Sequence, residues 1–522
     1  MGDEPQTRVV VQAPVGRFGD VQTAATAENE VDWQAAEGPE QEACILSFAA
    51  MELQRHLAEC SDVAAECLAA DSAPTATDTL TVRIETRRAL AAAGRPAPAG
   101  LSHAPQSFAV EAVDAAGSDG EVRPTEYRVV GVDAVGALYG TYELLTRLGF
   151  AWFSPDPSDR AVPDRLNLPS LDLRESPSFV LRGFWATDGR ATEEFLLWMA
   201  RNRLNLWSAE QPNKPFCRKL GIRFTTGGHA IFARYADPSV YFADHPEWYG
   251  LRGGARSDDI RGVVGDNICF ANSEVRGHIA SRLADDLADG EWRWVDLINV
   301  WALDNGRYCE CDECARLGNP TDQILLLAHD CRKAILEAKA AGRINREVTV
   351  SVPAYHESLD PPTRPLPADF DHDGVVVTFF PIERCYVHAF ADPRCAEMNR
   401  DLVRFWNRWV ANLENPFRGS MLVGEYYNVS SYAGIASIFT ETMAADIRYY
   451  YETGARMLHY MHVPVANWGT LAATNCQFAA LLWNHECPLG DWFEAFLVGR
   501  YGELADEMGA VCRELERALA NA

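Results

Sequence analysis

The segment Trp294-Val-Asp-Leu-Ile-Asn-Val-Trp301, followed at once by Ala302-Leu-Asp-Asn-Gly306, shows the pattern that decides the fold. A short apolar run indicates a buried β-strand, and the polar turn after it carries groups that can do chemistry. The same theme of strand, polar turn and helix recurs through the second half of the chain. The strands predicted from it are Phe179–Trp185, Leu204–Ser208, Ile222–Thr226, Trp294–Trp301, Val348–Pro353, Val375–Phe380, Ser420–Gly424 and Met457–Met461.

Helical stretches lie between most of these strands. They are Glu193–Arg201, Gln323–Ala341, Ala396–Val410, Thr442–Thr453 and Leu471–Leu482. Eight strands joined by helical crossovers favour a (β/α)8 TIM barrel over an open sheet. We therefore predict an α/β protein with its barrel in residues 176–485.

Residues 1–175 predict a smaller α/β domain before the barrel. A helix is expected over Gly136–Gly149, and Val9–Val11 could form an edge strand. Asp156–Pro177 carries four prolines and is predicted to be a connector. Residues 486–522 form a predicted helical segment with an apolar stripe that would pack against the barrel or against a second copy in a homodimer. The stripe consists of Leu497, Leu504, Met508, Cys512, Leu515 and Leu519.

Charge and composition narrow the classes of partner. The chain of 522 residues has 47 Lys and Arg against 74 Asp and Glu, a formal charge of -27, which disfavours nucleic acid. The first residues show no signal peptide, and no apolar run approaches the roughly 18 residues of a membrane span. We expect a cytoplasmic protein whose 14 cysteines are reduced, some as metal ligands.

Polar and aromatic residues gather where the predicted strands end, which is where a barrel carries its chemistry. Flat aromatic rings stack on sugars, while carboxylates and amides bind hydroxyls, so the group predicts a carbohydrate substrate. For any single residue the alternative is a helix cap or a rim filler. The predicted substrate-binding residues are Trp185, Trp207, His229, Trp301, Asn305, His356, Glu357, Glu383, Arg384, Tyr426, Tyr427 and Trp468. Asp188, Glu210, Asn428, His462 and Asn467 occupy similar positions.

Glycoside cleavage needs two groups about the anomeric carbon, one to protonate the leaving oxygen and one to stabilise or attack the positive centre. The predicted catalytic pair is Asp304 and Glu425, with Glu357 and Glu383 in reserve. Asp304-Asn-Gly306 could alternatively be a simple turn, because all three residue types favour one. No cofactor is expected for catalysis.

Three thiols within six residues, Cys309, Cys311 and Cys314, offer soft ligands at chelating spacing. We predict a structural zinc that braces the loop, with Cys385 as fourth ligand and His388 as its alternative. Bystander thiols or a disulfide are the competing interpretations. Five further cysteines are assigned to the core: Cys217, Cys269, Cys331, Cys395 and Cys476. His245-Pro-Glu-Trp-Tyr-Gly250 begins an insertion expected to form a short hairpin.

Longer stretches resemble known families. Gly136-Ala-Leu-Tyr-Gly-Thr-Tyr-Glu-Leu-Leu-Thr-Arg-Leu-Gly-Phe-Ala-Trp-Phe-Ser-Pro155 and Glu175-Ser-Pro-Ser-Phe-Val-Leu-Arg-Gly-Phe184 resemble α-glucuronidases and β-N-acetylhexosaminidases. Asp304-Asn-Gly-Arg-Tyr-Cys-Glu-Cys-Asp-Glu-Cys314 and Arg384-Cys-Tyr-Val-His388 resemble a bacterial family of glycosidase-like proteins described by a domain of unknown function.

This resemblance implies a zincin-like domain before a catalytic barrel that removes a terminal sugar, N-acetylhexosamine-type or uronic acid. In substrate-assisted hexosaminidases two neighbouring acids follow strand 4, whereas here Asp304 is followed by Asn305. Asp304 therefore either orients the acetamido group, leaving the acid role to Glu425 or Glu357, or is itself the acid. A glucuronidase would need a cation such as Arg384. A lyase, a phosphorylase and a non-catalytic sugar-binding protein are the alternatives.

Overall fold

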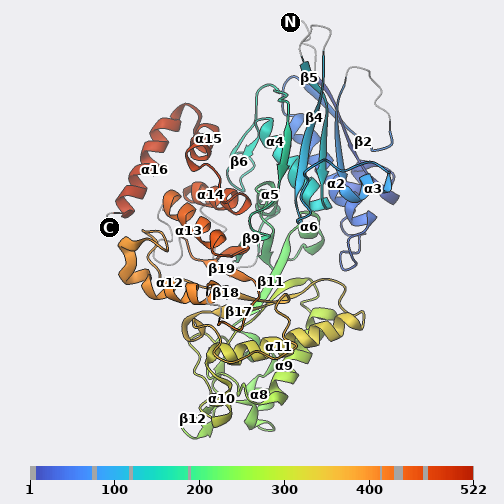
Figure 1. The fold of residues 1–522 in the computed structure, drawn as a ribbon. Coiled ribbons are helices and arrows are strands. Elements are labelled where there is room, and N and C mark those ends of the chain that lie inside the picture. The colour runs from blue at the N-terminus through green and yellow to red at the C-terminus, as the bar shows by residue number, and fades with distance from the viewer. Residues whose placement is uncertain are drawn as a thin grey trace.

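The computed structural model describes residues 7–72, 79–116, 122–185, 190–411, 414–427, 439–461 and 468–520. An N-terminal sheet with its helices lies at the top of Figure 1, the strands of a barrel lie in the centre, and the two C-terminal helices lie together at the upper left.

Eight parallel strands close into a barrel in the order β10-β11-β16-β17-β18-β19-β20-β9. Their bounds are β9 Leu181–Trp185, β10 Leu206–Ser208, β11 Arg223–Gly228, β16 Val295–Val300, β17 Thr349–Ala354, β18 Val375–Phe379, β19 Met421–Glu425 and β20 Met457–Met461. Every residue of β18 and β19 is buried, as expected for parallel strands covered on both faces. The predicted barrel is confirmed, and each strand begins and ends within two residues of its predicted bounds.

Helices follow most of the barrel strands. They are α5 Glu193–Arg201, α6 Lys214–Lys219, α7 Ile231–Tyr235, α8 Pro238–Tyr241, α9 Ser273–Ala288, α10 Asp312–Leu317, α11 Pro320–Ala340, α12 Ala396–Val410, α13 Thr440–Glu452 and α14 Ala472–Trp483. Local capping chemistry sets several starts: the Thr192 side chain accepts a hydrogen bond from the Phe195 N–H, and Asn319 and Asp322 form a capping box on α11.

The insertion after β11 contains two small hairpins rather than the single one expected. The first pairs β12 Leu251–Arg252 with β13 Ala255–Arg256, and the second pairs β14 Ile260–Arg261 with β15 Val264–Gly265. Gly253, Gly254 and Gly262 have positive φ angles, which lets the chain reverse direction within so few residues.

The N-terminal unit is a six-stranded mixed sheet in the order β2-β1-β3-β5-β4-β8. Its strands are β1 Thr7–Ala13, β2 Val63–Ala69, β3 Leu80–Thr86, β4 Phe108–Ala116, β5 Val122–Gly131 and β8 Asp172–Glu175. Its helices are α1 Val21–Ala25, α2 Pro39–Leu57, α3 Arg87–Ala92 and α4 Ala134–Arg147. A two-stranded ribbon of β6 Ala151–Trp152 and β7 Arg160–Ala161 follows.

Two predictions in this unit were wrong. The strand at Val9–Val11 is interior, because β1 pairs with both β2 and β3. The proline-rich connector contains β8, which pairs with β4 alone and so lies at the edge of the sheet, where nearby prolines are tolerated.

The C-terminal segment consists of two helices, α15 Leu489–Tyr501 and α16 Ala505–Ala520, that pack on each other. Leu497 and Cys512 are buried, as the predicted stripe requires. Leu504 is 60% exposed, because it lies in the one-turn 3-10 helix Gly502–Leu504 that separates the two α-helices.

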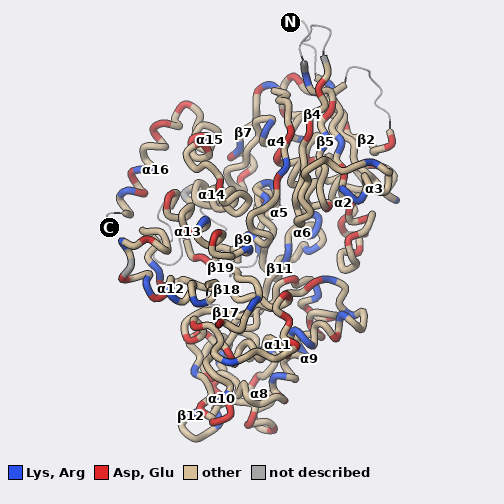
Figure 2. The backbone as a smooth tube through the Cα atoms, viewed as in Figure 1, with Lys and Arg blue, Asp and Glu red and all other residues tan. Residues whose placement is uncertain are grey.

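Acidic and basic positions are interspersed through both the sheet unit and the barrel (Figure 2). Many of them form local ion pairs, such as Arg343 with Asp285 and Asp289. Within the described residues, no helix is both long and apolar enough to span a membrane.

Candidate active site

Three carboxylates follow consecutive barrel strands. Asp304 lies four residues after β16, Glu357 three after β17 and Glu383 four after β18. These strands are parallel neighbours, so their carboxyl ends meet at one rim. Asp304 is partly exposed, and Glu357 and Glu383 are exposed. All three can therefore reach a ligand from solvent.

The phenol of Tyr355 stands among these carboxylates. Burial, together with the negative charges of Asp304, Glu383 and Glu357, raises the pKa of Tyr355 to about 12. Charge interactions at a partly exposed site act over a short range. The Tyr355 ring also lies 6.1 Å from that of His229, which belongs to the same rim.

An aromatic floor lies beside the carboxylates. The ring centroid of Trp301 lies 4.9 Å from that of Trp185, 5.0 Å from that of His229 and 5.0 Å from that of Phe380. Among the described residues, the buried indole N–H of Trp301 has no hydrogen-bond partner. Trp301 is itself buried, so the partly exposed rings of this floor are those of Trp185 and His229, and these could contact a sugar.

His229 is fixed in orientation at this rim. Its Nδ1 lies 2.5 Å from the carbonyl oxygen of Ala302, so Nδ1 carries the proton and Nε2 is left as an acceptor. Burial lowers the pKa of His229, against the opposing effects of this carbonyl and of Asp304. The residue is thus a neutral imidazole.

The loops that carry the carboxylates are held in uncommon backbone conformations. Asn305 has φ of 49° and His356 has φ of 44°, both in the left-handed region. Asn tolerates this region, whereas His adopts it rarely, and such residues concentrate at functional sites. The Asp304 N–H donates to the carbonyl of Val263 at 2.7 Å, so the insertion fixes this turn.

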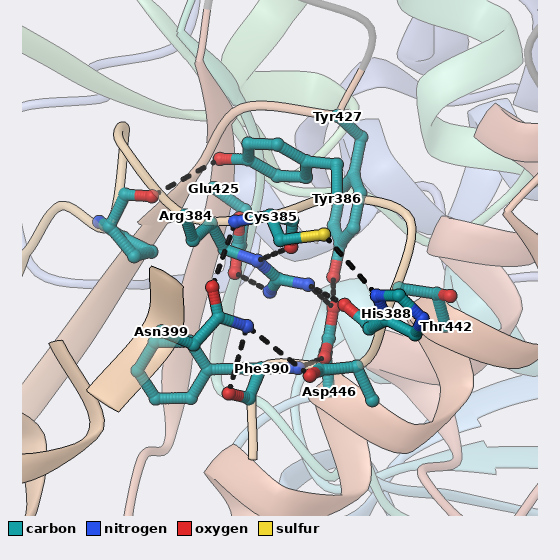
Figure 3. Close-up of polar contacts among 12 residues, drawn as sticks. Arg384, Cys385, Tyr386, His388, Phe390, Asn399, Glu425, Tyr427, Thr442 and Asp446 are labelled. Atoms are coloured by element: carbon teal, nitrogen blue, oxygen red, sulfur yellow. Dashed lines mark hydrogen bonds and ion pairs between the residues drawn. The ribbon is translucent and has the colours of Figure 1, made fainter. Parts of the chain in front are cut away.

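Glu425, the last residue of β19, occupies a different environment. Its side chain and that of Arg384 are both 0% exposed, and Arg384 Nη1 lies 2.9 Å from Glu425 Oε1. Figure 3 shows the guanidinium of Arg384 between Glu425 and Asp446, whose Oδ2 lies 2.7 Å from Nη2. The Tyr427 hydroxyl donates to Asp446 at 2.9 Å, and the Tyr450 hydroxyl donates to Glu425 at 2.7 Å.

This buried network shifts the ionisation of Glu425. Burial raises the pKa of Glu425, the Arg384 charge opposes this, and the neighbouring Asp446 adds to it, so the pKa lies above its ordinary value. Glu425 nevertheless lies at the carboxyl end of the barrel, because it is the last residue of β19. The two predicted catalytic residues lie at the carboxyl ends of β16 and β19, and of the two only Asp304 reaches solvent.

Three predicted substrate-binding aromatic residues lie in the core instead. Trp207 is fully buried and its Nε1 donates to Gln211 Oε1 at 3.2 Å. Trp468 packs on Trp198 with ring centroids 4.7 Å apart. Tyr427 is fully buried in the Arg384 network. Asp188, Asn428, His462 and Asn467 lie outside the described residues.

Sequence reasoning did not select several residues of this region. Asp446 and Tyr450 lie on α13 and reach the strand ends only through tertiary packing. Phe380 directly follows β18, so its position at a strand end could have revealed it.

The thiols form two groups. The Sγ atoms of Cys269, Cys309, Cys311 and Cys314 all lie within 4.8 Å of one another. Cys385 lies in the second group, with His388 and Cys395. The fourth thiol beside the three-cysteine loop is therefore Cys269, and the assignment of Cys385 to this cluster was wrong. Cys269 is buried in the core as predicted, but its part in the cluster was not. The spacing of Cys269, forty residues earlier in the chain, gave no signal.

A cavity of about 700 Å³ lies away from this rim, and its lining includes residues that precede β9 in the chain. It is lined by Glu175, Arg203, Trp483 and Trp492 among others, where the sheet unit meets α14 and α15. Barrel chemistry belongs to the carboxyl ends of the strands, so we place the site at the rim and not in this cavity.

Two solved structures share the fold. The first is a family GH115 4-O-methyl-α-glucuronidase with specificity for decorated arabinogalactans, at 14% identity and a TM-score of 0.55, covering 99% of this chain and 62% of that one. The second is a GH138 enzyme targeting pectin rhamnogalacturonan II, at 13% identity and a TM-score of 0.52, covering 98% of this chain and 55% of that one. This chain thus spans less than two thirds of either protein.

No curated protein matches the sequence. The family model described as a domain of unknown function, DUF4838, matches residues 153–510, which include the whole barrel and most of the C-terminal helices. The chain therefore belongs to the DUF4838 family.

Proposed function

We propose that the protein is an exo-acting glycoside hydrolase that removes a terminal sugar of the N-acetylhexosamine type. The observation that carries the proposal is that Asp304, Glu357 and Glu383 follow three neighbouring parallel strands at one rim of the barrel, where all three reach solvent. The aromatic floor at Trp301 adjoins them, and the shared fold of two carbohydrate-active enzymes supports the same class.

In this proposal Asp304 is one member of the acid and base pair, because it is partly exposed beside His229 and Tyr355. The second member is Glu357 or Glu383, which are exposed on the same rim. Glu425 is a positioning residue, since its side chain is fully buried and bonded to Arg384 and Tyr450.

The state of Arg384 favours a neutral sugar over a uronic acid. The GH115 protein is a glucuronidase, and a uronate needs a cation that is free to pair with it. Arg384 is already paired with two carboxylates and its Nε donates to the Cys385 carbonyl at 3.0 Å. It has no exposed surface with which to meet a substrate.

Aryl glycosides test the activity. Aryl N-acetylhexosaminides of both anomers should be screened, and one anomer should be hydrolysed faster than aryl hexosides and aryl glucuronides. Turnover of glucuronides alone would contradict the choice of sugar. An unsaturated product, or dependence on phosphate, would replace hydrolysis by lyase or phosphorylase chemistry. Binding without turnover on every substrate would indicate a sugar-binding protein.

A panel of variants tests the residues. Asp304→Asn should lower kcat by about 10²- to 10⁴-fold, because a general acid or base contributes that much. Of the two glutamate variants, Glu357→Gln and Glu383→Gln, one should lower kcat by the same factor. The remaining variant of the two glutamates is the matched control and should change kcat little. Melting temperatures should stay at the wild-type value, since all three side chains reach solvent. Full activity of Asp304→Asn would remove the assignment.

A further inference from the structure

Four thiols from two separate segments meet beside the active-site loop. Cys269 ends the insertion after β11, whereas Cys309, Cys311 and Cys314 lie between β16 and α10 or in its first turn. All four residues are buried. All four are free thiols, and their sulfur atoms converge within 4.8 Å.

The distances between the sulfur atoms fit a metal and not a disulfide. Cys269 Sγ lies 3.7 Å from both Cys311 Sγ and Cys314 Sγ. Around a tetrahedral zinc with Zn–S bonds of about 2.3 Å, sulfur atoms lie about 3.8 Å apart. A disulfide would bring one pair to about 2.05 Å.

Backbone N–H groups point at these sulfur atoms. Leu251 N–H donates to Cys309 Sγ at 3.2 Å, Ala271 N–H to Cys314 Sγ at 3.3 Å, and Cys314 N–H to Cys311 Sγ at 3.4 Å. Donors to sulfur stabilise the negative charge of thiolates and hold metal ligands in orientation. The surroundings are therefore arranged for thiolates, although the cluster is buried.

We propose that one structural zinc ion is bound by four thiolates, those of Cys269, Cys309, Cys311 and Cys314. Four protein ligands leave no open position for water or substrate, so the ion does not take part in the reaction. Cobalt or cadmium would occupy the same tetrahedral sulfur site.

The ion joins the insertion to the loop that carries Asp304. Between these segments, Arg307 N–H donates to the Gly265 carbonyl at 3.1 Å, and Leu303 N–H donates to Asn267 Oδ1 at 2.9 Å. The zinc ion would hold the insertion and the Asp304 loop together at their cysteine ends. Its removal should therefore weaken the contact between these two segments. The metal site itself stands whether or not the protein is a hydrolase.

Metal analysis and X-ray absorption of the purified wild-type chain test the proposal without any variant. We expect about one zinc per chain, with four sulfur neighbours at about 2.3 Å. No tightly bound metal, or nitrogen and oxygen in the first coordination shell, would overturn it. These readouts do not depend on activity, so they stay separate from the test of hydrolysis.

Two cysteine variants locate the ion. Cys269→Ser should lose the zinc, while Cys385→Ser, from the second thiol group, should retain it. The opposite pattern would place the metal at Cys385, His388 and Cys395 and overturn the assignment. If Cys269→Ser does not fold, cobalt replacement in the wild type provides the same decision. The intensity of the sulfur-to-cobalt absorption increases with the number of coordinating thiolates, which is four at the proposed site and two at Cys385, His388 and Cys395.

Discussion

Arg384 shows how one residue can be mistaken for a substrate contact. It follows β18 on the rim, where an exposed cation would bind an acidic sugar. Instead its side chain has no exposure and lies between the carboxylates of Glu425 and Asp446. Two buried carboxylates with one buried cation are stable only while the cation stays in place.

Arg384→Met should therefore lower the free energy of unfolding by about 3–5 kcal/mol, because two buried carboxylates lose their partner. Denaturant unfolding measures this change. Arg394→Ala is the control, since Arg394 is 76% exposed and pairs with Asp392 at the surface, and it should unfold like wild type. Equal stability of the two variants would show that the Arg384 network adds nothing to the fold.

Among the secondary-structure elements, α11 shows how a single carboxylate sets a helix start. Asp322 accepts a hydrogen bond from the Asn319 N–H at 2.8 Å, which completes the capping box. It also accepts from the backbone N–H groups of Thr363 at 3.0 Å and Arg364 at 2.9 Å. The start of α11 is thus tied to the chain that follows β17, which carries Tyr355 and Glu357.

Asp322→Ala should lower the free energy of unfolding by about 3 kcal/mol, since a cap contributes about 1 and hydrogen bonds to a buried charge about 1.5–3. Thermal and denaturant melts will measure it. Asp401→Ala on α12 provides the comparison, because Asp401 is 71% exposed and should tolerate the change. Asp322→Asn should fall between Asp322→Ala and wild type, as it keeps one acceptor.

In the whole molecule, the sheet unit and the barrel are joined through a buried carboxylate. Glu52 of α2 lies 3.0 Å from Arg201 Nη2 of α5 and accepts a hydrogen bond from Tyr142 at 3.2 Å. Burial raises the pKa of Glu52, but the charges of Arg201 and Arg55 outweigh this, so its pKa lies below the ordinary value of 4.5.

The lowered pKa of Glu52 determines how the free energy of unfolding changes with pH. A carboxylate with a lowered pKa stabilises the fold above its unfolded pKa and loses this contribution as pH falls through the folded value. Glu52→Gln should therefore be less stable than wild type at pH 7, and the difference should shrink as pH falls below about 4.5. Unfolding measured across this pH range checks it; a difference independent of pH would contradict the ionic role.

The sequence by itself determined the barrel, its eight strands and the positions of three carboxylates just after the strand ends. Apolar runs and turn residues act within a few positions of one another, so they can be interpreted without knowing the fold. Asp304, Glu357 and Glu383 follow their strands within four residues, and His229 and Trp301 lie at the expected ends for the same reason.

Only the tertiary structure decided which of these residues meet and which reach solvent. Burial of Glu425 depends on Asp446 and Tyr450 of α13, and the fourth thiol, Cys269, comes from a segment forty residues before Cys309. Likewise, strand pairing places β1 inside the N-terminal sheet, although it was predicted at an edge, and places β8 at the edge. Contacts between distant segments are set by packing of the whole chain, which a local sequence pattern does not contain.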